Sequence, residues 1–222
     1  MGHTGKKSEQ MIRLYDYVLS ADCYKIRLML ALLGREFEPV KIDIHPGREN
    51  QSAEFLSVNP RGRIPVLDDG GLVVSDPTAI LTYLALRHDG KRTWLPDDAA
   101  LSGQIMMWLA FSGAELDRIS QIRTNAITSA GGDPPGAMAD AYNSLAILED
   151  HLAEAELTGR LWLVGDHPTI ADIAVFPPVI LAPDGEVSLD GFPAIWRWLD
   201  RVKRLPGFIV MPGIMPNLAG AV

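Results

Sequence analysis

The sequence predicts a small α/β domain followed by an all-helical domain, and three observations lead to this prediction. Between residues 12 and 84, short apolar strands alternate with helical segments in the order strand, helix, strand, helix, strand, strand, helix. Residues 88–98 are charged and rich in turn-forming residues, which is typical of a linker. Every longer apolar pattern beyond them has helical spacing. We therefore expect a leader or tag that is disordered at residues 1–10, a first domain at residues 11–87 and a second at residues 99–222.

The first domain begins with a strand, a helix and a second strand. Residues 12–17 alternate weakly between apolar and polar side chains, which favours a strand. Ser20 or Asp22 can cap the following helix, which ends at Gly34. Residues 37–42 predict the second strand, and the crossover helix makes it parallel to the first.

A hairpin extends this sheet. Pro65 directly precedes the strand at residues 66–67, where its missing N–H group costs no ladder hydrogen bond. Gly70 and Gly71 turn the chain into a further strand at residues 72–74. Because a hairpin is antiparallel and the first two strands are parallel, we expect a small mixed sheet.

The helix after the hairpin starts next to the strand edge. Ser75 or Asp76 can cap it, and Pro77 suits its first turn, where the missing donor costs little. The edge beside Pro65 and the helix N-terminus beside Asp76 should therefore lie close together. Extended backbone can pair at such an edge and a carboxylate can bind at such a helix end, so this stretch suits a small ligand of peptide character.

The second domain consists of helical patterns. They cover residues 99–127, 139–157, 169–181 and 192–205. The pattern at residues 169–181 is apolar nearly all round, so we expect the buried central helix there. Thr169 and Asp172 at its start form an aspartate variant of the capping box.

The composition excludes several classes of partner. A net charge of -8 disfavours nucleic acid and anionic membranes, because basic patches bind both. The single cysteine excludes an internal disulfide, and the histidines show no metal-ligand spacing. No apolar run is long enough to span a bilayer, and no signal-peptide pattern opens the chain. We therefore expect a cytoplasmic protein with no metal, nucleic-acid or membrane partner.

Three stretches resemble a known family, in the family's order. They are Leu14-Tyr15-x-Tyr17-x-x-Ser20-x-x-Cys23-Tyr24-Lys25-Ile26-Arg27-Leu28; Asn59-Pro60-x-Gly62-x-Ile64-Pro65-Val66-Leu67 with Asp76-x-x-Ala79-Ile80-Leu81-x-Tyr83-Leu84; and Gly165-x-x-x-Thr169-Ile170-Ala171-Asp172-Ile173-Ala174 with Leu205-Pro206-Gly207-Phe208. The chain thus resembles the cytosolic glutathione S-transferases, specifically bacterial serine-type members and the theta, zeta and phi classes. The resemblance implies a thioredoxin-like first domain, an all-α second domain and a homodimer. It also implies that glutathione, the co-substrate, is conjugated to small hydrophobic electrophiles, as in detoxification.

The catalytic group would act on the thiol of glutathione, which reacts as a thiolate. A free thiol of pKa about 8.5 is only a few per cent ionised at neutral pH, and lowering this pKa by two units takes about 2.7 kcal/mol. The residues alone favour Ser20 as a helix cap, whereas the resemblance implies that its hydroxyl stabilises the sulfur anion.

Cys23 is the rival to Ser20. At a helix start its own pKa could fall, and it could form a mixed disulfide with glutathione, although its register one turn into the helix favours a buried and inert thiol. Zeta-class isomerases carry a second serine and then a cysteine directly after the first serine. Ala21 and Asp22 stand in those places here, which argues against that activity.

The resemblance also implies binding residues for glutathione. Ile64 would offer its backbone N–H and C=O groups to the cysteinyl part, with Pro65 in the cis form, although the sequence alone favours trans. Gln51 and Arg63 would reach the glycyl carboxylate, and Asp76 the amino group of the ligand.

Pro77 departs from the family pattern. Relatives usually carry a serine there, and its N–H and hydroxyl hold the γ-glutamyl carboxylate; a hydrogen bond to a charged group is worth about 1.5–3 kcal/mol. Losing one weakens binding roughly tenfold to a hundredfold. Thr78 offers an N–H and a hydroxyl one residue on. We expect weak or altered glutathione binding.

Electrophile specificity would come from the helical half, near Met107, Phe111 and Glu115, with Met106 beside them. Met and Phe at helical spacing are more often core residues than pocket residues. Two alternative functions stay open at this point: a thiol oxidoreductase that uses Cys23, and a non-catalytic binding protein with the same fold, which Pro77 favours.

Overall fold

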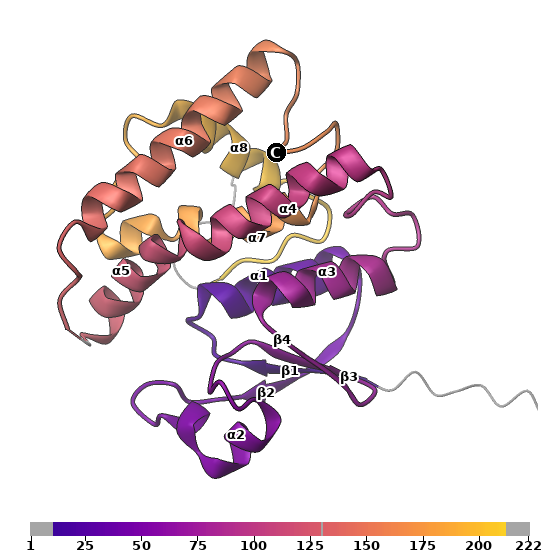
Figure 1. Ribbon diagram of the computed structural model, residues 1–222, viewed down its shortest axis with the longest axis vertical. Helices are drawn as coiled ribbons and strands as arrows, with labels where there is room; N and C mark the ends of the chain where they lie inside the picture. Colours follow the sequence, from indigo (N-terminus) through magenta and orange to yellow (C-terminus); the bar gives the residue numbers. More distant parts are fainter. Residues whose placement is uncertain (1–10, 130, 212–222) are drawn as a thin grey trace, which may run out of the picture.

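The structure is a computed structural model that describes residues 11–129 and 131–211. An α/β half and a helical half are packed against each other, with the sheet on the outer side of α1 and α3 (Figure 1). This is the fold class that the sequence predicts. The leader expected at residues 1–10 lies outside the described residues.

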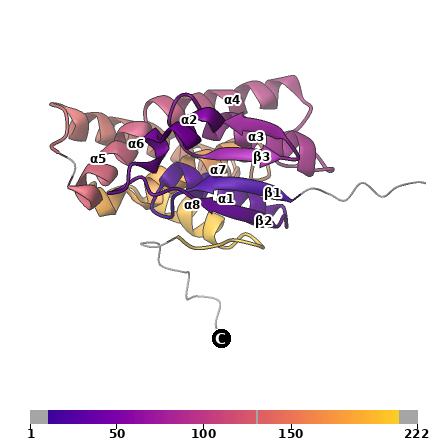
Figure 2. The same cartoon turned by 90° about the horizontal axis from the view of Figure 1, so that it is seen from below.

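The sheet has four strands in the order β2-β1-β3-β4, and β1 lies between β2 and β3 when the sheet is seen from below (Figure 2). β1 and β2 are parallel, and the other two pairs are antiparallel, so the prediction of a mixed sheet is confirmed. Leu14 of β1 pairs with Leu67 of β3 and is fully buried. The strands are β1 (Ile12–Asp16), β2 (Phe37–Lys41), β3 (Val66–Asp69) and β4 (Leu72–Ser75).

Three α-helices belong to the α/β half. They are α1 (Ala21–Leu32), α2 (Ala53–Val58) and α3 (Pro77–His88), with a short 3-10 turn η1 (Glu49–Gln51) before α2. α1 and α3 cover the face of the sheet that points to the helical half, and α2 lies on the opposite side (Figure 1). Ser20 caps α1 and Asp76 caps α3, both as expected from their side-chain oxygens.

The helical half differs from the prediction in one place. Residues 99–127 form two helices rather than one, because the chain breaks at Glu115 and Leu116. The N–H groups of both residues donate to the carbonyl oxygen of Phe111, and the side chain of Leu116 turns fully into the core. The helices are α4 (Ala99–Ala114), α5 (Asp117–Thr128), α6 (Ala137–Leu157), α7 (Ile170–Ile180) and α8 (Pro193–Lys203), with a 3-10 turn η2 (Ala182–Gly185).

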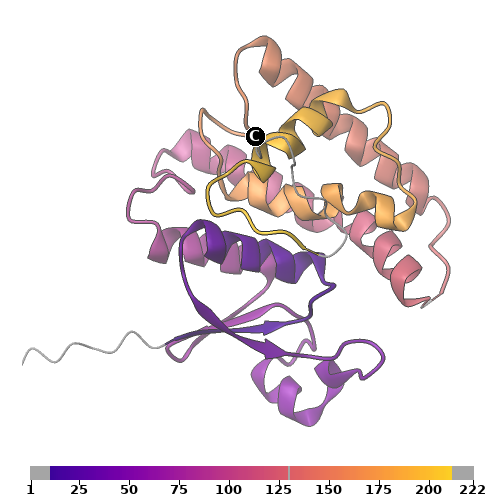
Figure 3. The same ribbon diagram turned by 180° about the vertical axis from the view of Figure 1, so that it is seen from behind.

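α7 is the central helix, as predicted. Nearly all its side chains are buried, and Thr169 and Asp172 form the expected capping box. Asp172 also accepts hydrogen bonds from the amide of Leu163 and the indole of Trp198, which ties the helix start to its neighbours. The chain after α8 runs back along α1 (Figure 3), where the Tyr24 hydroxyl donates to the carbonyl oxygen of Ile209.

Candidate functional site

The loop between β1 and α1 presents Ser20 at the boundary between the two halves. The Oγ atom of Ser20 accepts a hydrogen bond of 3.2 Å from the amide of Cys23. Among the described residues, none accepts the hydroxyl's own hydrogen. The half-buried side chain lines a hollow of about 270 Å³, together with residues such as Tyr17, Ile64 and Gln121. Capping the helix therefore leaves Ser20 free to donate to a ligand.

Cys23 has no exposed surface and does not line the hollow beside Ser20. Burial raises the pKa of the Cys23 thiol, and the negative charge of Asp16 raises it further. A thiolate is the reactive form, so the inert reading of Cys23 agrees with its surroundings.

The segment before β3 offers an unpaired backbone edge. The Ile64–Pro65 peptide bond is cis, as the resemblance implies. Neither the N–H nor the C=O group of Ile64 forms a hydrogen bond within the described part of the chain. Ile64 also lines the hollow beside Ser20, so its backbone groups are available close to that hydroxyl.

The N-terminus of α3 is occupied by its own cap. The Oδ1 atom of Asp76 accepts hydrogen bonds from the amides of Thr78, at 2.9 Å, and Ala79, at 3.2 Å. Pro77 has no N–H group, and the amide of Ile80 donates to the Asp76 carbonyl. The amide of Thr78, which the sequence offers as a replacement for the lost donor, is therefore engaged. Its hydroxyl has no partner among the residues described.

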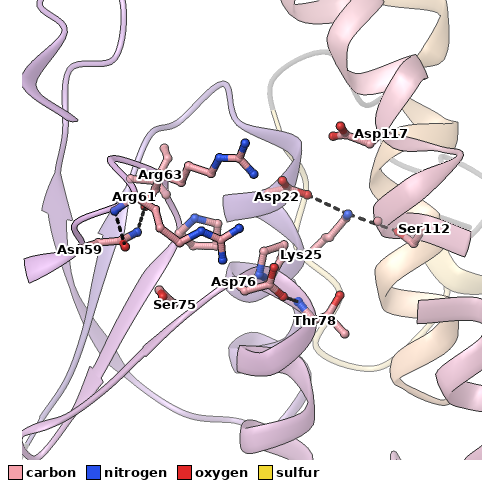
Figure 4. A pocket seen from close by; sticks show the side chains of 14 residues that line it. Asp22, Lys25, Asn59, Arg61, Arg63, Ser75, Asp76, Thr78, Ser112 and Asp117 are labelled. Atoms are coloured by element: carbon pink, nitrogen blue, oxygen red, sulfur yellow. Dashed lines mark hydrogen bonds and ion pairs between the residues drawn. The ribbon is translucent and has the colours of Figure 1, made fainter. Parts of the chain in front are cut away.

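A second hollow, of about 130 Å³, lies between this helix end and α4 (Figure 4). Lys25 lies across its wall: the Nζ atom is 2.7 Å from a carboxylate oxygen of Asp22 and donates to the Ser112 hydroxyl at 3.3 Å. Arg61 and Arg63 enter from the other side and form no ion pair with any described residue (Figure 4). The hollow is lined by Asp22, Lys25, Asn59, Arg61, Arg63, Ile64, Pro65, Ser75, Asp76, Pro77, Thr78, Ser112, Gly113 and Asp117.

The two hollows form one cleft, because they share Asp22, Ile64 and Asp117. The cleft runs between the α/β half and helices α4 and α5. It brings together Ser20, Ile64, Pro65, Arg63, Asp76, Pro77 and Thr78 from the residues that the sequence singles out.

Gln51 lies outside the cleft lining. Its side-chain amide is 3.4 Å from the carbonyl oxygen of Gly62, and it is exposed. Asn59 is buried and orders the same loop. Its side-chain NH2 group donates to the Arg63 carbonyl, and its side-chain oxygen accepts from the backbone amide of Arg61. Gln51 is therefore placed beside the loop that presents the two arginines.

The residues expected in the substrate pocket do not line the cleft. Met107 is exposed, and Phe111 packs edge-on against Trp108. Glu115 lines a separate hollow with Arg118 and Asp140. The same stretch of chain contributes Ser112, Gly113 and Asp117 to the cleft instead.

Sequence reasoning missed several lining residues, above all Lys25, Arg61 and Ser112. Lys25 and Asp22 stand three residues apart on the first turns of a helix, and that spacing is a signal for an ion pair. Ser112 gives no such signal, because its role comes from the packing of α4 against α7, which brings its hydroxyl within reach of Lys25.

In the described residues, no group of side chains forms a candidate metal site, and no helix is long and apolar enough to cross a membrane.

Comparisons with known proteins agree on one family. The family model of the glutathione S-transferase N-terminal domain matches residues 10–86, and the family model of the C-terminal domain matches residues 114–201. Over 202 residues the chain is 28% identical to the maleylacetoacetate isomerase of Pseudomonas aeruginosa, covering 89% of this chain and 93% of that protein.

Solved structures give the same picture. A glutathione S-transferase from Pseudomonas fluorescens is 32% identical with a TM-score of 0.81, covering 91% of this chain and 99% of that one. A glutathione transferase homologue from Lodderomyces elongisporus, solved with two glutathione molecules per subunit, is 28% identical with a TM-score of 0.80, over 89% and 95% of the two chains.

Proposed function

The chain belongs to the glutathione S-transferase family, and from this premise we propose that it adds the thiolate of glutathione to small electrophilic, largely apolar substrates. One observation supports this proposal most directly. The Ser20 hydroxyl and the unpaired backbone of Ile64 lie on the same cleft. A tripeptide that pairs with Ile64 can thus bring its sulfur to Ser20.

Ionisation of the thiol would depend on Ser20. Its hydroxyl accepts from the amide of Cys23 and would donate its own hydrogen to the sulfur anion. A hydrogen bond to a charged group contributes about 1.5–3 kcal/mol, and the N-terminus of α1 adds a favourable field of about 0.3–1 kcal/mol. Together these reach the roughly 2.7 kcal/mol that lowers a thiol pKa by two units.

Binding of the rest of glutathione would use side chains more than the helix end. Ile64 would pair with the cysteinyl backbone, and the second carboxylate oxygen of Asp76 is available to the ligand's amino group. Arg63 would pair with a ligand carboxylate, and Gln51 would assist from the edge of the loop. Because Asp76 takes the free amides of α3 and Pro77 supplies none, we expect glutathione to bind weakly.

The electrophile would enter the part of the cleft beside Ser20. Leu19, Ile44 and Ile127 give that hollow apolar surface. Met107, Phe111 and Glu115 stay predictions for the substrate pocket, and they lie outside the lining of the cleft.

Replacing Ser20 by alanine tests the proposed function. In the wild-type complex, the thiolate absorbance of bound glutathione should titrate well below the free value of about 8.5, and the protein should turn over a generic aryl halide. The S20A variant should raise that pKa by about one to two units and lower kcat roughly tenfold to a hundredfold. Ser52 also caps a helix of the same half, by accepting from the amide of Phe55 at 3.1 Å, but it lies outside the cleft. S52A is therefore the matched control, and an equal loss in both variants would reject Ser20 as the catalytic group.

The alternatives predict different outcomes. A thiol oxidoreductase would keep its activity in S20A and lose it in a Cys23→Ser variant, and the buried Cys23 argues against it. A non-catalytic binding protein would neither ionise glutathione nor turn over an aryl halide, and Pro77, which removes a donor from the helix end, favours this alternative. An isomerase activity, suggested by the name of one relative, would have to work with Ala21 and Asp22 beside Ser20.

We also propose a cytoplasmic homodimer with a role in detoxification. Exposed apolar side chains lie on the edge strand β4 and on α3 and α4, where a partner subunit would cover them. They are Leu72, Val73, Leu86, Met106 and Met107, each 39% to 57% exposed. Light scattering should give twice the chain mass for the wild type and for Leu157→Glu, whose leucine is 90% exposed on α6, whereas Leu86→Glu should give a monomer.

A further inference from the structure

A buried arginine of the helical half contacts the loop that carries Ser20. Arg123 of α5 is 4% exposed, and its Nη1 atom donates to the carbonyl oxygen of Leu19 at 2.7 Å. Its Nε atom donates to a carboxylate oxygen of Asp184 at 2.9 Å. Leu19 and Arg123 are 104 residues apart, so this contact exists only because the two halves are packed together.

The arginine is held in place by close backbone packing. Asp184 belongs to the turn η2, and a Cβ atom on the neighbouring Gly185 would lie 2.9 Å from the Cα and N atoms of Arg123. Only glycine allows η2 to approach α5 so closely. The approach fixes the carboxylate of Asp184 on the guanidinium, which is a planar fork that can bond to two partners at once.

Every carbonyl of the loop just before Ser20 is bound by an arginine. Arg27 of α1 donates to the carbonyl oxygens of Tyr17 and Val18, at 3.4 Å and 3.0 Å, and also pairs with Asp16. Arg123 binds the third carbonyl, that of Leu19. The first two contacts lie within the α/β half, whereas the third comes from the helical half.

We propose that Arg123, held by Asp184, is a positioning residue that fixes the Ser20 hydroxyl in the direction of the glutathione sulfur. This inference rests on the proposed function, because it assumes that Ser20 meets a thiolate. The peptide bond between Leu19 and Ser20 directly links the carbonyl that Arg123 holds to the residue whose hydroxyl would meet the thiolate. The amide of Ser20, in the same peptide group, donates to the carbonyl oxygen of Tyr17 at 2.9 Å. Loss of Arg123 therefore removes one of the two hydrogen bonds that hold this peptide plane, and the hydroxyl spends less time at the sulfur.

The test measures the thiol pKa of bound glutathione and the kinetics of aryl halide conjugation in three variants. Arg123→Met should raise the thiol pKa by about one unit and lower kcat roughly tenfold, with KM little changed, since one pKa unit corresponds to a tenfold change in an equilibrium. Arg123→Lys keeps the charge but not the fork, so it should restore part of the pKa shift. Asp184→Asn, which leaves the arginine without its ionic partner, should fall between the wild type and Arg123→Met.

A matched control has the same kind of contacts away from the cleft. Arg201 of α8 donates to the carbonyl oxygen of Leu161 at 3.1 Å and pairs with Glu156 at 3.1 Å. Arg201→Met therefore removes a similar arginine and should leave the thiol pKa unchanged. A merely structural role of Arg123 would lower the melting temperature in both methionine variants without moving that pKa.

Combining the variants shows whether Arg123 acts through Ser20. In the Ser20→Ala background, Arg123→Met should add little further change in thiol pKa, because the group that it positions is gone. Full additivity would overturn the inference, as would an Arg123→Met thiol pKa equal to the wild-type value. If Arg123→Met does not fold, Arg123→Lys and Asp184→Asn supply the same comparison. A wild-type protein that does not ionise glutathione would overturn the proposed function itself and this inference with it.

Discussion

The Oδ1 atom of Asp76 lies 2.9 Å from the amide nitrogen of Thr78, so the carboxylate that faces the cleft also closes the N-terminus of its own helix. A side-chain cap of this kind is worth about 1 kcal/mol to the helix. It also means that a bound carboxylate would have to displace Asp76 from these amides or use other donors. The helix end that would otherwise attract an anion is already neutralised.

Replacing Pro77 by serine should restore donors at this point. The serine adds an N–H and a hydroxyl without removing the Asp76 cap, so glutathione should bind roughly tenfold to a hundredfold more tightly. Isothermal titration calorimetry measures this directly. Pro193 also occupies the first turn of a helix, at the start of α8, so Pro193→Ser controls for the loss of a helix-starting proline. Micromolar affinity in the wild type with no gain in Pro77→Ser would contradict the prediction.

Cys23 should be unreactive in the folded protein. Burial raises the pKa of its thiol, so an aromatic disulfide reagent at pH 8 should label it only after unfolding. The chain contains one cysteine, so complete labelling in denaturant gives one thiol per chain. Cys23→Ala keeps the backbone amide that donates to Ser20 and should retain turnover within about twofold. Labelling of the native protein at the rate of the unfolded chain would show instead that the thiol is accessible.

Asp172 should be a large contributor to stability. Its carboxylate is fully buried and accepts from the amides of Leu163 and Thr169 and from the indole of Trp198. Asp172→Ala leaves these donors unpaired, so chemical denaturation should give a loss of about 3–5 kcal/mol. Asp98 caps α4 at an exposed position, and Asp98→Ala should cost only about 1 kcal/mol. Equal losses in the two variants would show that burial of Asp172 adds nothing.

Glu156 should make stability depend on pH in the acidic range. The hydrogen bond from Arg197 lowers its pKa, and a further bond from Arg201 acts in the same direction. The carboxylate therefore stabilises the folded chain above its unfolded pKa of about 4.3, and this contribution is lost as the pH falls through the lower folded value. The melting temperature of the wild type should exceed that of Glu156→Gln at neutral pH, and the difference should shrink below roughly pH 4.5.

The control for this effect is Glu154→Gln. Glu154 is on the same helix, and its side chain forms no ion pair with another described residue. The melting temperature of the Glu154→Gln variant should follow that of the wild type at every pH. A constant difference between wild type and Glu156→Gln down to pH 3 would mean that the two arginines do not stabilise the charged form.

The sequence predicts the α/β half well because its signals are local. Ser20, Gly34, Asp76 and Pro77 are capping or helix-ending residues whose preferences depend only on their neighbours in the chain. The break between α4 and α5 is missed for the opposite reason. Apolar spacing continues through Leu116, so the pattern cannot show that this side chain turns into the core.

The candidate site is predicted only in part. Residues on the strand edge and the helix starts are found, because strand and helix ends have sequence signals. Lys25, Ser112 and Asp117 come together because α1, α4 and α5 all pack on α7, which no local pattern encodes. Met107 and Phe111 have the expected apolar character, but the rotation of α4 directs them away from the cleft lining.

The contact between Arg123 and the Leu19 carbonyl has a consequence for how such proteins diversify. A chimera that joins this α/β half to a foreign helical half would change the side chains around the electrophile. It would also remove the hydrogen bond that Arg123 donates to the peptide group before Ser20. Recombination between relatives at the linker would therefore alter the reactivity of the bound thiol together with selectivity for the electrophile, unless the new helical half also carries an arginine at the position of Arg123.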